Sequence, residues 1–122
     1  MRITQVAQHA DDLDRAVDFY SSLLDTEVAA RFEPPGLAFF MLGETRLLLD
    51  RAAPPALIYF NVEDVRSRVE VLRVRGVEID TEPGVIFRHE NSDIGPTGTN
   101  EWMAFIRDSE GNLVGLVSQV DS

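Results

Sequence analysis

The sequence contains no cysteine and only two histidines, His9 and His89. The absence of cysteine excludes disulfide bonds, thiolate metal sites and cysteine nucleophiles. The apolar runs are far shorter than the roughly 20 residues that a membrane-spanning helix needs. No charged-then-apolar signal segment opens the chain, because Gln5, Gln8 and His9 interrupt it. We therefore expect a cytoplasmic protein that does not insert into membranes.

Basic residues are also scarce, with 11 Lys and Arg against 21 Asp and Glu, which gives a formal charge of −10. A field of this sign disfavours nucleic acid and anionic membranes as partners, and it favours cationic ligands. The acidity is equally compatible with a surface that is merely well solvated. A hydrophobic share of 44% and a length of 122 residues indicate one globular domain with an ordinary core.

Two amphipathic stripes predict the helices. The first begins after Asp11 or Asp12 and continues through Leu13 to Leu24, and the second begins at Val65 and ends before Gly76. Alternating or continuous apolar segments predict the strands, over residues 2–9, 27–32, 37–42, 46–50, 57–62, 77–79, 85–87, 102–107 and 113–118. The predicted order is therefore β-α-β-β-β, repeated once.

The repetition predicts a single α+β domain, 1–122, built from the modules 1–52 and 55–122. Asp12-Leu13 and Asp64-Val65 open the two helices, and the same offset aligns Gln5 with Leu57. Each helix covers one face of its own sheet. We expect the other faces of the two sheets to curve around a shared cleft.

Two motifs within this repeat, DDLDRAVDFYSSLL and FIRDSEGNLVGL, resemble the vicinal oxygen chelate superfamily. That superfamily includes glyoxalase I, methylmalonyl-CoA epimerase, extradiol dioxygenases and the bleomycin resistance proteins. The resemblance extends over essentially the whole chain. It implies the glyoxalase/bleomycin resistance fold, in which two tandem βαβββ modules form a curved sheet around a cleft.

Metal-dependent members of this superfamily carry four ligands, one on the first and one on the last strand of each module. The resemblance places these positions on Gln5, Leu48, Leu57 and Gly115. Leucine has no donor atom and glycine has no side chain, so a single possible ligand remains. We therefore expect no metal and no other cofactor. A non-standard site drawn from Gln5, Asp50, His89 and Glu101 is not supported by any spacing.

Strand alternation predicts an apolar trough with a few polar groups, as is usual for a pocket that holds an organic ligand. The predicted ligand-binding residues are Gln5, Ala7, His9, Phe39, Arg46, Leu48, Asp50, Leu57, Tyr59, His89, Trp102 and Gly115. Phe40 and Met41 are further candidates for the pocket wall. The phase of the strand over 102–107 is open, so either Trp102 or Met103 faces the trough. Gly115 is interpreted as an open pocket floor rather than a bulge.

The segment 88–101 has no counterpart in the first half, and its glycines and proline predict a loop. It is either a lid or rim of the cleft, or an unstructured surface excursion. His89 within it is a candidate to hydrogen-bond a ligand or to move a proton. His9 and Tyr59 are the other catalytic candidates, although a lone histidine is commonly an ordinary structural side chain.

The sequence is compatible with three functions. The first is a metal-free homodimer with sites near the protomer interface, which sequesters an apolar or cationic aromatic compound as the bleomycin resistance branch does in antibiotic resistance. The second is an enzyme of the superfamily, of lyase, epimerase or dioxygenase type, that acts on a small metabolite through a non-standard site. The third is a regulatory or structural domain whose cleft is packed shut. The missing ligands favour the first, which makes enzymatic activity the less expected outcome and leaves it open.

Overall fold

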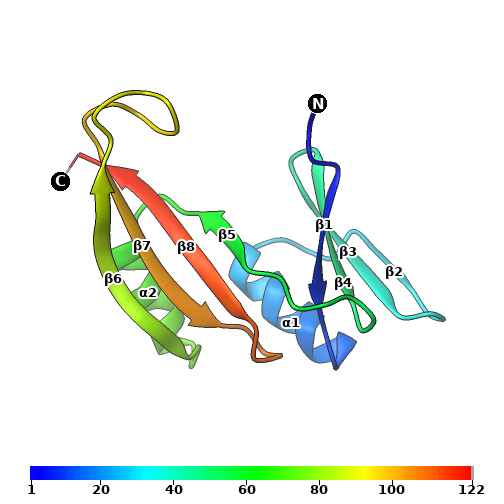
Figure 1. The fold of residues 1–122 in the computed structure, drawn as a ribbon. Coiled ribbons are helices and arrows are strands. Elements are labelled where there is room, and N and C mark those ends of the chain that lie inside the picture. The colour runs from blue at the N-terminus through cyan, green and yellow to red at the C-terminus, as the bar shows by residue number, and fades with distance from the viewer. Residues whose placement is uncertain (122) are drawn as a thin grey trace. The chain divides into compact units, whose positions relative to one another are not determined.

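The structure is a computed structural model that describes residues 1–121, and it divides into two compact units. Unit 1 comprises Met1–Ala56 and Asp108–Asn112. Unit 2 comprises Leu57–Arg107 and the segment that starts at Leu113. Each unit contains one helix packed on a four-stranded sheet (Figure 1). Among the described residues, no helix is both long and apolar enough to cross a membrane.

Unit 1 has the sheet order β1-β4-β3-β2, with β1 parallel to β4 and the other neighbours antiparallel. Its elements are β1 (Gln5–His9), α1 (Leu13–Leu24), β2 (Ala30–Phe32), β3 (Leu37–Leu42) and β4 (Thr45–Asp50). The first two strands begin three residues later than the sequence pattern predicts, at Gln5 and Ala30. The order of elements is the predicted one.

Helix α1 follows from its apolar stripe and from its N-cap. The carboxylate of Asp12, and not that of Asp11, accepts a hydrogen bond from the Arg15 N–H at 3.1 Å. This bond satisfies one of the amide groups that a helix start leaves without an internal partner. The residues buried along the stripe are Leu13, Ala16, Val17, Tyr20 and Leu23. The predicted helix is therefore confirmed over its full length.

Unit 2 repeats the arrangement with the sheet order β5-β8-β7-β6, in which β5 is parallel to β8. Its elements are β5 (Ile58–Asn61), α2 (Val65–Val74), β6 (Ile79–Arg88), β7 (Asn100–Arg107) and β8 (Leu113–Val120). The separate strands predicted over 77–79 and 85–87 are wrong, because β6 is one strand with register shifts on both sides of Gly84. Strand β6 lies at the edge of its sheet, and Pro83 falls where the register shifts between Thr81 and Gly84, which are the places where strands tolerate proline.

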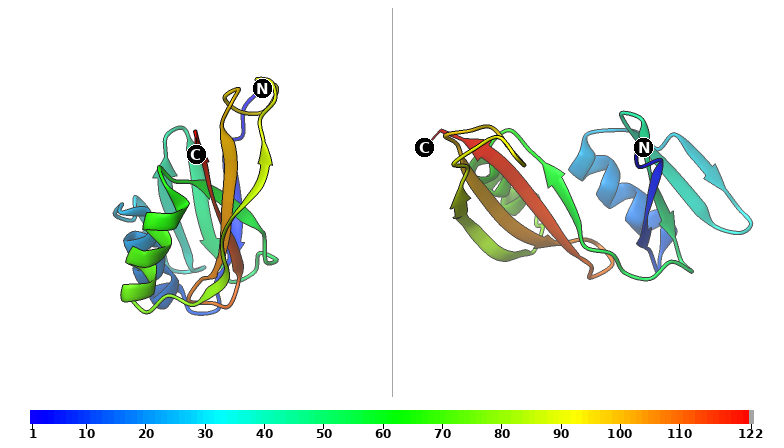
Figure 2. Two further views of the ribbon diagram at one scale, coloured as in Figure 1. Left: turned by 90° about the vertical axis from the view of Figure 1, so that its left-hand side faces the viewer. Right: turned by 45° about the horizontal axis from the view of Figure 1, so that its top comes forward.

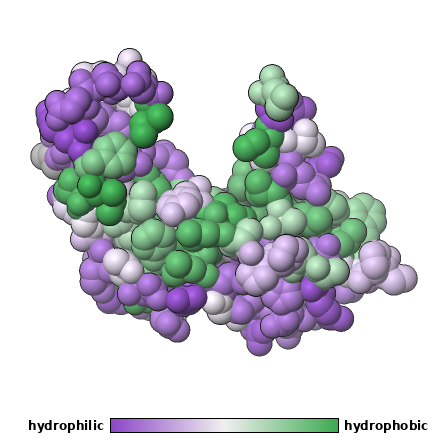
Figure 3. All heavy atoms as spheres, in the orientation of Figure 1, coloured by the Kyte–Doolittle hydropathy of each residue, from purple (hydrophilic) through white to green (hydrophobic). Residues whose placement is uncertain are grey.

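Each helix covers only one face of its sheet, as Figure 2 shows for α2. The covered faces hold the core: Phe40, Leu47 and Leu49 in unit 1, and Ala104, Ile106, Val114 and Leu116 in unit 2 are all fully buried. We call the opposite surface of each sheet its helix-free face. Figure 3 looks onto this face of unit 2, where apolar residues gather over the strands. The α+β class and the two βαβββ modules are confirmed.

Candidate functional site

The helix-free face of unit 1 contains a pocket of about 330 Å³. Its walls are formed by Gln5, Ala29, Ala30, Phe32, Phe39, Met41 and Arg46. Two other hollows, one beside α2 and one beside the start of α1, are lined mainly by charged and hydroxyl side chains. Because ligand pockets are mostly apolar with a few placed polar groups, the pocket on the sheet of unit 1 is the strongest candidate site.

Strand register brings the pocket residues together. Arg46 lies opposite Gln5 on β1 and opposite Met41 on β3, and Phe39 lies opposite Ala30 on β2. Directly opposed residues in a sheet point to the same face, so all four strands contribute to one surface. Phe32 and Phe39 pack edge to face with their ring centroids 5.9 Å apart. The result is an apolar, partly aromatic wall.

Arg46 supplies the only charge among the lining residues. Its Nε donates a hydrogen bond to Oε1 of Gln5 at 3.0 Å. Its guanidinium carbon lies 5.9 Å from the centroid of the Phe39 ring, within cation–π range. The polar end of the pocket is therefore a guanidinium that an amide and an aromatic ring hold in place.

Of the residues predicted to bind a ligand, Gln5, Phe39 and Arg46 line this pocket. Ala7 and Leu48 lie opposite each other further along the same face, and Leu48 is only 9% exposed. Sequence reasoning missed Ala29, Ala30 and Phe32, although the alternation of Ala30 and Phe32 in the short strand β2 is the signal that could have identified the latter two.

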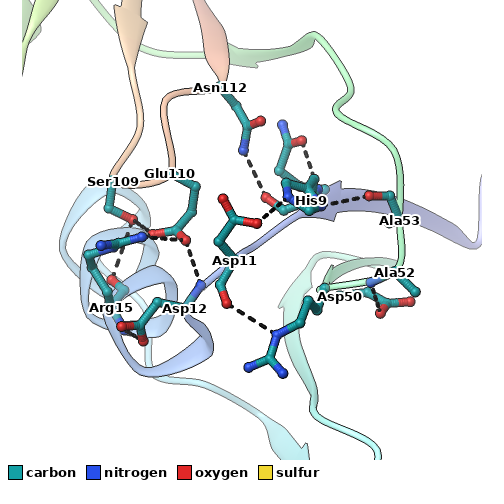
Figure 4. A network of polar contacts seen from close by, with 12 residues as sticks. His9, Asp11, Asp12, Arg15, Asp50, Ala52, Ala53, Ser109, Glu110 and Asn112 are labelled. Carbon is teal, nitrogen blue, oxygen red and sulfur yellow. Dashed lines mark hydrogen bonds and ion pairs between the residues drawn. The ribbon is translucent and has the colours of Figure 1, made fainter.

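His9 and Asp50 lie opposite each other at the far end of β1 and β4, and both are engaged in local contacts (Figure 4). The His9 Nδ1 lies 2.8 Å from the Ala53 carbonyl oxygen, and Nε2 lies 2.8 Å from a carboxylate oxygen of Asp11. Both neighbours are acceptors, so only the doubly protonated imidazolium satisfies both. The Asp11 hydrogen bond is the main reason that the pKa of His9 is raised above 6.5. A general base needs a free ring nitrogen, which His9 lacks in this arrangement.

The middle of the second motif, Asp108–Asn112, forms a polar turn in unit 1. The Asp108 carboxylate accepts hydrogen bonds from the Tyr20 hydroxyl at 2.6 Å and from the Glu110 and Asn112 N–H groups at 2.8 Å. Burial raises the pKa of Tyr20 well above its ordinary value, and the Asp108 charge adds to the effect. The Asn112 side chain donates to the His9 carbonyl oxygen at 2.8 Å. This middle part of the motif is therefore explained by packing and hydrogen bonding within unit 1.

Glu110 of the same turn binds the start of α1 (Figure 4). Its carboxylate accepts two hydrogen bonds from Arg15, at 2.7 and 3.0 Å, and one from the Asp12 N–H at 2.8 Å. Burial raises the pKa of this carboxyl, but the hydrogen bonds from Arg15, Asp12 and Ser109 outweigh burial and lower it from 4.5 to about 2. Glu110 thus adds a second carboxylate cap to α1.

In unit 2, Gly115 is covered by an aromatic ring, and the interpretation of an open pocket floor is wrong. A Cβ atom at Gly115 would lie 2.5 Å from Cδ2 of Tyr59, its cross-strand neighbour. The Tyr59 ring also packs edge to face on Phe105, with centroids 5.9 Å apart. The pairing of β7 with β8 continues through Gly115 without a bulge. The glycine therefore permits a close approach of the Tyr59 ring to the backbone.

Trp102 lies on the helix-covered face, so its predicted place in the trough is also wrong. It is opposite Ser118, whose hydroxyl accepts a hydrogen bond from the Val65 N–H of α2. The Arg66 guanidinium of α2 stacks on the indole with its carbon 4.3 Å from the ring centroid. Met103 is the residue that shares a face with Gly115 and Val117, which settles the phase that the sequence left open.

His89 is 3% exposed, which contradicts a role as an open lid histidine. Its Nε2 lies 2.8 Å from a carboxylate oxygen of Glu101, and that oxygen also accepts a hydrogen bond from Gln119 at 3.0 Å. Gly95 packs so closely on the imidazole that a Cβ would lie 2.4 Å from it. The connection between β6 and β7 folds around this histidine and is not an unstructured excursion.

The residues at the four family metal positions do not fit a divalent cation. Gln5 Oε1 already accepts from the Arg46 guanidinium, whose positive charge opposes a nearby cation. Leu48 and Leu57 have no donor atom, and Gly115 lies under the Tyr59 ring. Leu57 precedes β5 and is 47% exposed. Within residues 1–121, no group of three or more His, Asp or Glu side chains could hold a metal ion.

The sequence is similar to that of a known protein family. The model of the Glyoxalase/Bleomycin resistance protein/Dioxygenase superfamily matches residues 2–116. The chain belongs to this superfamily. Its two βαβββ modules and the two sequence motifs are thereby explained as family features. No curated protein sequence matches the chain.

Solved structures of this superfamily share the fold. An antibiotic binding protein, TnmS3 from Streptomyces, has 19% identity and a TM-score of 0.75, with 98% of this chain and 96% of that chain covered. A lactoylglutathione lyase from Agrobacterium tumefaciens has 23% identity and a TM-score of 0.68, with 96% and 92% covered. A superfamily member from Sphaerobacter thermophilus has 17% identity and a TM-score of 0.72, with 97% of each chain covered. At these identities the likeness establishes the fold alone.

Proposed function

We propose that this superfamily member is a small-molecule-binding protein that sequesters an aromatic compound in the pocket of unit 1. The observation that carries the proposal is the pocket of about 330 Å³ with its apolar wall of Phe32, Phe39 and Met41. Aromatic side chains offer flat surface that a planar ligand can cover, and each buried CH₂-sized group contributes about 0.8 kcal/mol. The fold is shared with an antibiotic binding protein, which is consistent with this use of the scaffold.

The chemistry of the site supports binding rather than turnover. The two histidines are committed elsewhere: both ring nitrogens of His9 have acceptor neighbours, and the His89 side chain is buried against Glu101. The donor set at the family positions does not fit the metal on which the superfamily's usual reactions depend. Tyr59, the third catalytic candidate, packs on Gly115 and Phe105 in unit 2. None of the three candidates lines the pocket.

A fluorescence titration with N-phenylnaphthylamine, a neutral aromatic probe, tests the proposal. We expect saturable binding by the wild-type chain and a loss of about tenfold or more in affinity when Ala30→Phe fills the pocket. The control is Val74→Ala, which truncates an apolar side chain on α2 that is 88% exposed and lies outside the pocket. Equal binding by the wild type and by Ala30→Phe would show that the probe does not use this pocket, and the proposal would fail.

We further propose that the chain forms a homodimer with its ligand sites near the protomer interface. Large apolar side chains on or beside the helix-free faces are exposed, among them Phe32, Met41, Leu57 and Tyr59. Surfaces of this kind commonly mark protein interfaces. Light scattering coupled to size-exclusion chromatography should give twice the mass of the 13.6 kDa chain, and Tyr59→Lys should shift the distribution toward the monomer. A wild-type monomer at high protein concentration would contradict the dimer.

A further inference from the structure

We infer that the pocket of unit 1 selects aromatic ligands that carry an anionic group, such as a carboxylate or a sulfonate, and that Arg46 recognises this group. The inference rests on the proposed function, because it names the ligand class of the same pocket. It replaces the cationic ligand that the acidity of the whole chain suggests. Arg46 is distinguished by the partners that it has and by those that it lacks.

Arg46 has no carboxylate partner among the described residues, although acidic side chains outnumber basic ones almost two to one. Two of the four other arginines of unit 1 are paired with carboxylates, Arg15 with Glu110 and Arg31 with Asp14 and Glu33. The other two, Arg2 and Arg51, donate hydrogen bonds to backbone carbonyl oxygens and do not line the pocket. The Arg46 guanidinium instead bonds the neutral Gln5 amide and lies over the Phe39 ring. Neither partner neutralises its charge, so a full positive charge remains at the edge of an apolar pocket.

The contact with Gln5 also sets which nitrogen atoms a ligand can reach. It occupies Nε, and within the described part of the chain the two terminal nitrogens of Arg46 make no hydrogen bond. These two nitrogens can together hold both oxygens of a carboxylate or sulfonate. Gln5 thus acts as a positioning residue that fixes the plane of the guanidinium through its side-chain oxygen.

The remaining lining residues suit the rest of such a ligand. Phe32, Phe39 and Met41 provide apolar surface directly beside the guanidinium, and no acidic side chain lines the pocket. A cationic ligand would find no counter-charge there and would be repelled by Arg46. The net charge of −10 acts at longer range, where physiological salt screens it over about 8 Å. The local charge therefore decides the ligand class.

A matched pair of probes tests the inference: anilinonaphthalene sulfonate, which is anionic, and N-phenylnaphthylamine, which has the same aromatic skeleton without the sulfonate. We expect the wild type to bind the anionic probe about five- to tenfold more tightly, a modest gain because Arg46 is solvent-exposed. Arg46→Gln should abolish this preference by weakening the binding of the anionic probe about five- to tenfold. Gln5→Leu should reduce the preference, whereas Gln5→Glu should reduce it further by neutralising Arg46.

The possible results separate the two proposals. Equal binding of both probes by the wild type, or an unchanged preference in Arg46→Gln, would overturn the anionic ligand class and leave the pocket itself in place. Insensitivity of both probes to Ala30→Phe would instead show that the pocket is not used, which overturns the proposed function. Arg68→Gln, at a half-buried position on α2 outside the pocket of unit 1, is the control for a general change in net charge and should leave the preference intact.

Discussion

At the scale of single residues, Gly115 shows how a family position can change its role. In metal-dependent relatives this strand position carries a ligand, but here the missing side chain leaves room for the Tyr59 ring on the neighbouring strand. An aromatic ring over a cross-strand glycine covers backbone that would otherwise face solvent. Ala7 and Leu48 form the corresponding cross-strand pair in unit 1. In that pair the larger side chain, Leu48, is on the last strand of the module. In unit 2 the larger side chain, Tyr59, is on the first strand.

Replacing Gly115 by alanine should have opposite effects with and without the Tyr59 ring. In the wild type, the new Cβ would displace Tyr59 and we expect a loss of about 1 kcal/mol in the free energy of unfolding. In a Tyr59→Ala background the same change should stabilise by about 0.5 kcal/mol, because alanine restricts the unfolded chain more than glycine does. Urea denaturation of the four proteins measures both effects. The same sign in both backgrounds would refute the close contact.

The imidazole of His9 should link stability to pH. Its pKa is raised in the folded chain by Asp11 and the Ala53 carbonyl, so its stabilisation is present below 6.5 and is lost as pH rises through the folded pKa. The difference in melting temperature between the wild type and Asp11→Asn should therefore shrink between pH 6 and pH 9. An NMR titration of the two histidines should place the His9 midpoint above 6.5. A midpoint at or below 6.5 would contradict the contacts.

At the scale of elements, α1 depends on a segment that is distant in sequence. Its own N-cap is Asp12, but the Glu110 carboxylate binds both the Asp12 N–H and Arg15. An anionic group at a helix N-terminus is favoured by the helix dipole. The buried Tyr20 hydroxyl in the middle of α1 needs the Asp108 carboxylate from the same turn. These contacts connect the two sequence motifs within this chain.

Glu110→Gln should destabilise the chain by about 1–2 kcal/mol at pH 7, because the amide keeps the shape but loses the charge that faces Arg15. The pKa of Glu110 is lowered from 4.5 to about 2, so its stabilisation is present above 4.5 and is lost as pH falls toward 2. The gap between wild type and variant should close over that range. Asp18→Asn, an exposed change on α1, is the control and should lie within about 0.5 kcal/mol of the wild type.

At the scale of the whole molecule, superfamily membership defines the architecture and leaves the chemistry to individual positions. The fold is shared with a lyase and with an antibiotic binding protein, so the scaffold alone does not choose between turnover and binding. In this chain, whether the scaffold binds or turns over a ligand depends on the side chains at the four family metal positions. Leu48, Leu57 and Gly115 have no side-chain atom that could bind a metal. The one remaining candidate, Oε1 of Gln5, accepts a hydrogen bond from Arg46.

Divalent metal should therefore leave the stability of the whole chain unchanged. A ligand present at 100 times its dissociation constant would add about 2.7 kcal/mol to the free energy of unfolding. We expect no such gain when Zn²⁺, Ni²⁺ or Mg²⁺ is added to chain treated with a chelator, and substoichiometric metal in protein purified without one. A rise in melting temperature that Gln5→Leu removes would show that the donor set binds metal after all.

Sequence alone determined both helices, most of the strands, the repeat and the family. Helix α1 follows from its apolar spacing and Asp12, and most strands follow from their alternation, because these signals depend on neighbours in the chain. Strand β6 was missed as a single strand because its register shifts interrupt the alternation. Tertiary structure decided the places of the aromatic rings and polar side chains: Tyr59 on Gly115, Trp102 beneath Arg66, and His89 buried against Glu101. It also placed Arg46 beside Gln5, on a neighbouring strand of the sheet that is distant in sequence. Such contacts depend on strand register and on the path of loops. Neither can be inferred from the local spacing of residue types, because both involve residues that are far apart in sequence.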